Sequence, residues 1–158
     1  MRMLIAGVGN RFMGDDGFGP RAIDVLSSST LPDWVELRDA GTAGRSLAYD
    51  LDEYEAVIFL DAMETGLGPG KLRIGEVEAE GLEDEELREI FRSSSHEGGL
   101  ADLIIFSRAI GTLPSKVFIV GCEPVSLGNS LELSGEMEET TKEAAREVLA
   151  LLDSLGGT

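Results

Sequence analysis

Residues 3–26, with the sequence MLIAGVGNRFMGDDGFGPRAIDVL, decide the fold that we expect for this chain. The run from residue 3 to residue 8 is apolar throughout, which is typical of a strand buried on both faces of a parallel sheet. A glycine-rich turn over residues 9–17 follows, and apolar residues then recur at helical spacing over about residues 17–28. A strand, a tight turn and a helix in this order predict the first unit of an α/β fold.

The rest of the chain continues the alternation of strands and helices. Strands are predicted over residues 34–38, 56–60, 71–77 and 116–121, and helices end near residue 49 and span about 100–110 and 135–155. The acidic stretch 76–89 is interpreted as a solvated loop and helix. Residues 71–77 alternate between apolar and polar, which is typical of an antiparallel edge strand with one wet face. We therefore predict one domain over residues 1–158, an α/β sandwich on a mostly parallel sheet.

The charge of the chain excludes several classes of partner. The chain has 158 residues, and 13 basic against 30 acidic residues give a net charge of −17. A chain this acidic repels nucleic acid and anionic lipid, so neither is expected as a partner. No segment approaches 18 consecutive apolar residues, so no membrane span is predicted. The single cysteine, Cys122, permits no intramolecular disulfide, which favours a cytoplasmic location, and we expect a buried side chain at a strand end.

The familiar nucleotide and hydrolase motifs are missing from the sequence. Gly7 and Gly9 begin a G-x-G pattern, but Phe12 stands where a dinucleotide-binding loop needs its third glycine. The chain has no Gly-Lys-Ser/Thr phosphate loop and no G-x-S-x-G nucleophile turn. We therefore expect no organic cofactor and no serine-hydrolase chemistry.

Carboxylates occur where the predicted strands end. Asp16 lies in the turn after the first strand, Asp39 ends the second and Asp61 ends the third. Any one of them could be a turn former, and Asp16 could cap the following helix. Because ligands of parallel sheets bind at the carboxyl ends of the strands, three such residues together predict a site there. Carboxylates with the only histidine, His96, could hold a divalent cation and leave positions open for substrate.

The motifs resemble those of a known family. Gly7-Val8-Gly9-Asn10 followed by Gly14-Asp15-Asp16-Gly17-Phe18-Gly19 resembles the opening signature of the nickel–iron hydrogenase maturation endopeptidases. The likeness continues with Asp39-Ala40-Gly41-Thr42-Ala43-Gly44, with Asp61-Ala62 and with Ser95-His96. It covers nearly the whole chain in order.

The resemblance implies a fold, a reaction and a partner. The fold is a three-layer α/β/α sandwich with a five-stranded mixed sheet and one antiparallel edge strand. The reaction is removal of a C-terminal extension from the precursor of the hydrogenase large subunit after nickel has been inserted. The nickel is carried by the substrate, and the resemblance places Asp16, Asp61 and His96 in contact with it. In this interpretation Asp16, Asp39 and Asp61 form the catalytic set, and Asp39 could act as general base. The Gly41-Thr42 turn could offer backbone N–H groups to the cleaved segment or to an oxyanion.

Two alternatives remain open at this point. One is a protease of similar fold that uses paired aspartates without nickel, as spore-protease-like enzymes do. The other is a non-catalytic maturation factor that binds nickel or the large subunit. A monomer is expected at this chain length.

Overall fold

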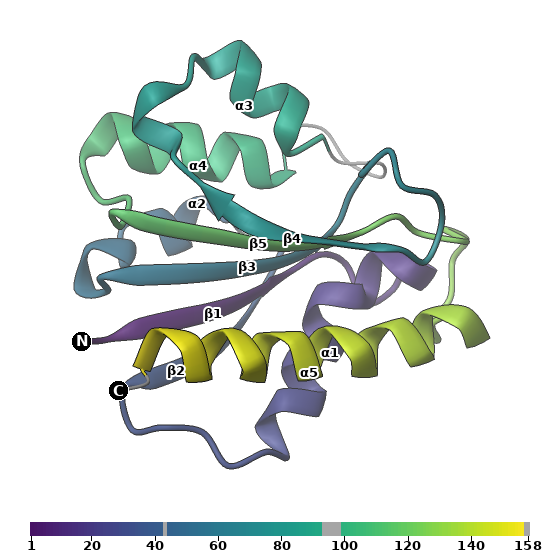
Figure 1. Cartoon of the computed structure of the whole chain (residues 1–158). Coiled ribbons are helices and arrows are strands. Elements are labelled where there is room, and N and C mark those ends of the chain that lie inside the picture. The colour runs from purple at the N-terminus through teal and green to yellow at the C-terminus, as the bar shows by residue number, and fades with distance from the viewer. Residues whose placement is uncertain (43, 93–98, 157–158) are drawn as a thin grey trace.

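The computed structural model describes residues 1–42, 44–92 and 99–156, and its centre is one five-stranded sheet. The strands are β1 (Met3–Val8), β2 (Val35–Gly41), β3 (Ala56–Ala62), β4 (Leu72–Val77) and β5 (Lys116–Cys122), in the order β2-β1-β3-β5-β4. All neighbours are parallel except β4, which pairs antiparallel with β5 at the edge. The predicted mixed sheet with one antiparallel edge strand is confirmed (Figure 1).

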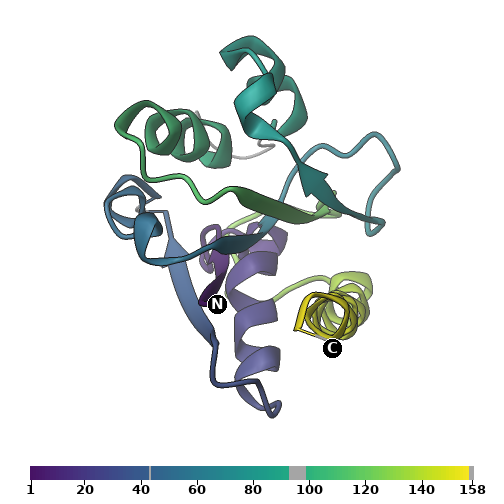
Figure 2. The same cartoon turned by 60° about the vertical axis from the view of Figure 1, so that its left-hand side comes forward.

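Helices cover both faces of this sheet. One face packs against α1 (Phe18–Ser27) and α5 (Gly135–Gly156), and we call it the α1 face. The opposite face packs against α2 (Gly44–Ala48), α3 (Asp84–Ile90) and α4 (Gly99–Ile110), and we call it the α4 face. Short 3-10 turns are η1 (Gly14–Gly17), η2 (Leu51–Glu53) and η3 (Ala79–Gly81). Figures 1 and 2 show the resulting three layers, as expected for an α/β/α sandwich.

The pleat of the strands divides the apolar core between the two faces. In β1, Met3 and Ile5 point to the α1 face, and Leu4, Ala6 and Val8 point to the α4 face. Both sets are buried, because successive side chains of a strand alternate between faces and helices cover each one. This explains why the sequence of β1 is apolar without alternation.

Glycine allows α1 to lie directly on the strand ends. A Cβ at Gly19 would lie closer than 3.0 Å to backbone atoms of both Val8 and Leu60. Gly9 has a φ of 137°, and a Cβ there would collide with the carbonyl oxygen of Asp16. The absence of two side chains therefore brings η1, with Asp16, against the carboxyl ends of β1 and β3.

The strands β2, β3 and β5 end later in the chain than predicted. β2 continues three residues beyond the predicted end at residue 38, because its pairing with β1 extends through Gly41, with a register shift between Gly7 and Val8. Asp39 and Asp61 accordingly lie inside their strands and not after them. In the part of the chain that the structure describes, no helix is long and apolar enough to cross a membrane.

Candidate functional site

Asp61 is the most unusual side chain at the carboxyl edge of the sheet. It is fully buried, and among the described residues neither of its carboxylate oxygens has a hydrogen-bond partner. Burial raises the pKa of Asp61 well above its usual range, and the charge of Asp16 raises it further. The backbone N–H of Ala62 opposes this shift without meeting hydrogen-bond geometry. A buried carboxylate of this kind needs either a proton or a cation.

Asp16 lies beside Asp61 because η1 packs against β3. It is also fully buried, and its Oδ2 atom accepts the backbone N–H of Asn10 at 2.8 Å. The alternative role of Asp16 as a helix cap is wrong. The N-cap residue of α1 is Gly17 and not Asp16, and the Asp16 carboxylate accepts the N–H of Asn10 in the preceding turn.

Asp15, next to Asp16 in the chain, has a structural role. Its carboxylate accepts the backbone N–H groups of Val125, Ser126 and Ser134 at 2.7–2.9 Å, and also the hydroxyl of Ser134. These bonds hold the β5–α5 loop against the β1–α1 turn. The two neighbouring aspartates therefore have different roles: Asp15 holds the β5–α5 loop, and of the two only Asp16 lies next to Asp61.

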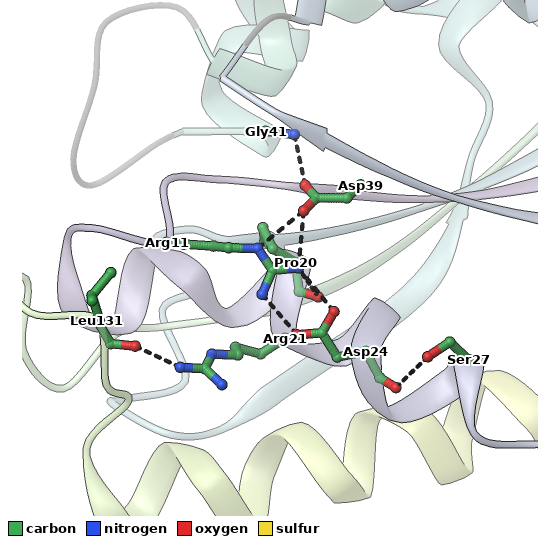
Figure 3. A network of polar contacts seen from close by, with 8 residues as sticks. All are labelled: Arg11, Pro20, Arg21, Asp24, Ser27, Asp39, Gly41 and Leu131. Carbon is green, nitrogen blue, oxygen red and sulfur yellow. Dashed lines mark hydrogen bonds and ion pairs between the residues drawn. The ribbon is translucent and has the colours of Figure 1, made fainter.

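Asp39 is held in an ion-pair network (Figure 3). Its Oδ2 atom accepts hydrogen bonds from Nε and Nη2 of Arg11 at 3.0 and 2.9 Å, and its Oδ1 atom accepts the Gly41 N–H at 3.0 Å. Arg11 also donates to both carboxylate oxygens of Asp24 and to the carbonyl of Pro20. Arg11 lowers the pKa of Asp24, and its own pKa is raised by these partners. The Gly41 N–H, one of the predicted donors to substrate, is thus already used.

Asp39 and Asp61 lie on opposite faces of the sheet. Asp39 is in register with Gly7, on the α1 face, as its contacts through Arg11 to α1 confirm. Asp61 is in register with Val8, one residue further on, and therefore points to the α4 face. The structure brings Asp16 and Asp61 together and separates Asp39 from them.

His96, the third predicted metal contact, lies outside the described residues. Helix α4 begins at Gly99, shortly after His96 in the chain, and covers the same face to which Asp61 points. Within residues 1–42, 44–92 and 99–156, no group of three His, Cys, Asp or Glu side chains could hold a metal ion. The described site is therefore a pair of carboxylates, and the prediction for His96 stays a prediction.

Cys122 is confirmed as a buried side chain at the end of β5. It packs against Met137, and burial raises the pKa of its thiol to about 12. A thiol with this pKa is protonated at neutral pH and is a poor nucleophile. It belongs to the core and not to the site.

A cavity at the other edge of the sheet has no part in this site. It measures about 520 Å³ and is lined by residues around the end of β4, the end of α4 and the start of β5, including Glu78, Arg108 and Lys116. These strand ends are at the amino edge of the parallel sheet, opposite Asp16 and Asp61.

Sequence reasoning missed the role of Arg11. It is the only basic residue of the glycine-rich turn, and a cation between several predicted carboxylates is a signal that could have indicated an ion pair. Nothing in the sequence distinguishes Asp15 from Asp16, because their roles depend on the direction of each side chain in η1.

Comparison with known proteins identifies relatives along nearly the whole chain. The profile of the family described as hydrogenase maturation protease matches residues 20–151. The hydrogenase 2 maturation protease of Escherichia coli is 36% identical over 160 residues, which cover 99% of this chain and 93% of that protein. The crystal structure of a hydrogenase 2 maturation peptidase from a Thaumarchaeota archaeon is 51% identical, with a TM-score of 0.74 over 96% of this chain and 98% of that one. The endopeptidase HybD of E. coli has a TM-score of 0.83 at 33% identity over 99% and 94% of the two chains.

Proposed function

The chain belongs to the hydrogenase maturation protease family, and from this premise we propose that it removes the C-terminal extension of a nickel–iron hydrogenase large-subunit precursor once nickel is in place. The protein is a peptidase, as its relatives are. The nickel ion belongs to the precursor and enters the site as part of the substrate. We place the reaction in the cytoplasm, where precursor chains are made.

One observation carries the proposal: Asp61 is buried without a hydrogen-bond partner among the described residues, next to a second buried carboxylate. Such a pair is unfavourable unless a proton or a cation compensates for the charge. A nickel ion presented by the precursor would supply the missing positive charge. The site would then bind a precursor that contains nickel in preference to one without it, because only the nickel ion compensates for the negative charge of Asp61.

The residues of this chain have distinct roles in the proposed reaction. Asp16 and Asp61, together with His96, would contact the nickel ion and thereby fix the adjacent polypeptide. Asn10 keeps Asp16 in place through its backbone N–H. A divalent ion held in this way can polarise the peptide carbonyl or lower the pKa of an attacking water, while the protein orients the bond to be cut.

Asp39 is expected to hold Arg11 of the β1–α1 turn in place and not to accept the proton of the attacking water as a general base. Three donors already occupy its carboxylate, which offers about four acceptor sites, and it lies on the face away from Asp61. We therefore expect Asp39→Asn to lower kcat by less than about tenfold, whereas loss of a general base costs about 10²–10⁴. Single-turnover cleavage of the nickel-loaded precursor measures this effect. A drop of two orders of magnitude with an unchanged Tm would return the general-base role to Asp39.

The proposed function is tested by the intact mass of a large-subunit precursor from the same organism. Nickel-loaded and nickel-free precursor are incubated in parallel with the wild-type protein and with the His96→Ala variant. We expect one discrete C-terminal loss of mass, only in the sample that contains both nickel and wild-type protein.

Each other outcome contradicts a specific part of the proposal. Loss of mass without nickel would indicate that Asp16 and Asp61 share a proton and cut without a metal. Binding without any loss of mass would indicate a maturation factor that is not a protease for this precursor. Full activity of His96→Ala would remove His96 from the site.

A further inference from the structure

The loops at the carboxyl edge expose several large apolar side chains. Phe12, Leu67, Val125 and Leu131 are 68%, 56%, 45% and 59% exposed. They are four of the eight exposed large apolar residues in the described part of the chain, and none of the four lies in a helix or strand. We call these four residues the apolar rim. Apolar side chains exposed on neighbouring loops at one edge of a sheet favour an interaction surface there.

Hydrogen bonds hold the loops that carry the rim against one another. Ser130 donates its N–H to the carbonyl of Phe12, which links the β1–α1 turn to the β5–α5 loop. Arg21 of α1 donates to the carbonyl of Leu131 on that same loop (Figure 3). Glu123 accepts the N–H groups of Thr65 and Gly66, which ties the β3–β4 loop to the end of β5.

The rim lies over the strand ends that carry the site. Its loops follow β1, β3 and β5, the three adjacent strands of which β3 is the middle one. Asp61 is on β3, with Val8 of β1 and Gly121 of β5 as its register neighbours. The rim loops therefore lie at the same edge of the sheet as Asp61, which is itself fully buried.

We propose that the apolar rim binds an apolar stretch of the precursor polypeptide next to the bond that is cut, an inference that rests on the proposed function. A second copy of this chain is a poor occupant, because it carries the same net charge of −17. Contact between two rims would also bring the exposed carboxylates of Glu132 and Glu136 of both copies close together, and these repel one another. A protease must hold the chain beside the cut bond in one place, and burial of exposed apolar side chains supplies this binding without further charge.

The test compares a rim variant with a matched control outside the rim. The rim variant is Phe12→Ser/Leu131→Ser. The control is Tyr49→Ser/Ile110→Ser, which removes two exposed apolar side chains at the C-terminal ends of α2 and α4; because the Tyr49 ring lies edge-on to Phe106, the Tm of the control is measured as well. Cleavage of nickel-loaded precursor is followed over a range of precursor concentrations. We expect the rim variant to raise KM about tenfold or more, with kcat unchanged within about twofold, because the lost contacts bind substrate and transition state equally. The control should match wild type.

A binding measurement separates this inference from the proposed function. In an Asp61→Asn background, which is not expected to cleave, precursor affinity should fall by the same factor of about ten when the rim is changed. If wild-type protein cleaves the precursor but the rim variant has an unchanged KM, only the rim inference fails. If wild-type protein does not cleave at all, the proposed function fails. A sedimentation coefficient that falls on changing the rim would assign the surface to a second copy and overturn the inference.

Discussion

We expect Asp61→Asn to reduce cleavage at least about a hundredfold while it raises the stability of the folded protein near neutral pH. The loss of activity follows because the amide cannot supply the negative charge that a nickel-loaded precursor would need. The gain of stability follows because Asp61 is a buried carboxylate without a hydrogen-bond partner among the described residues. The amide is also a buried polar group, so the gain comes only from removal of the ionisable group and is expected only above about pH 4.

The stability gain should depend on pH in one direction. The pKa of Asp61 is raised above its ordinary value of 3.8 in the folded state, so the folded protein binds more protons than the unfolded chain above that pH. The free energy of unfolding therefore falls as the pH rises from about 4 to the folded-state pKa, and stays lowered above it. Asn does not ionise, so the free energy of unfolding of the variant does not decrease with pH for this reason.

Thermal unfolding at pH 4 and pH 8 without nickel measures the effect. We expect nearly equal Tm values for wild type and Asp61→Asn at pH 4 and a higher Tm for the variant at pH 8. Asp153→Asn, at an exposed position of α5, is the matched control and should leave both values unchanged. A wild-type protein that is the more stable of the two at pH 8 would mean that Asp61 is already compensated in the resting state.

The second large effect is expected from Gly19→Ala. The added Cβ would meet backbone atoms of Val8 and Leu60, and backbone cannot move aside as the end of a side chain can. We expect a loss of about 3 kcal/mol or more, which is about 6–12 °C in Tm for a domain of this size. Cleavage should also fall, because α1 would carry η1 and Asp16 away from Asp61.

Gly135→Ala is the control for this substitution. Both glycines lie in the first turn of a helix, Gly135 in α5 and Gly19 in α1. A Cβ at Gly135, however, meets nothing within 4 Å. Its Tm should stay near that of wild type or rise slightly, since Ala is the better helix former. Equal Tm values for the two variants would show that α1 can shift from the strand ends without cost, and would remove the proposed link between Gly19 and the site.

Much of the fold could be predicted because it depends on local patterns. The apolar run of β1, the alternation of β4 and the helical spacing of α5 each report directly which sides of an element are buried. The position of Asp16 and Asp61 near strand ends could be predicted for the same reason. The extension of β2 could not, because it depends on its pairing with β1 across the sheet.

The sequence by itself determined the order of strands and helices, the mixed sheet and the edge at which the carboxylates gather. Only the tertiary structure decided which carboxylates meet. Asp39 and Asp61 differ by one position in register, and because strand side chains alternate with a period of two, that single step sends them to opposite faces. Asp15 and Asp16 are adjacent in the chain, yet one is used by the β5–α5 loop and the other faces Asp61. Burial and charge at a site come from neighbours that are distant in the sequence, and these neighbours are assembled only when the sheet and its helices pack.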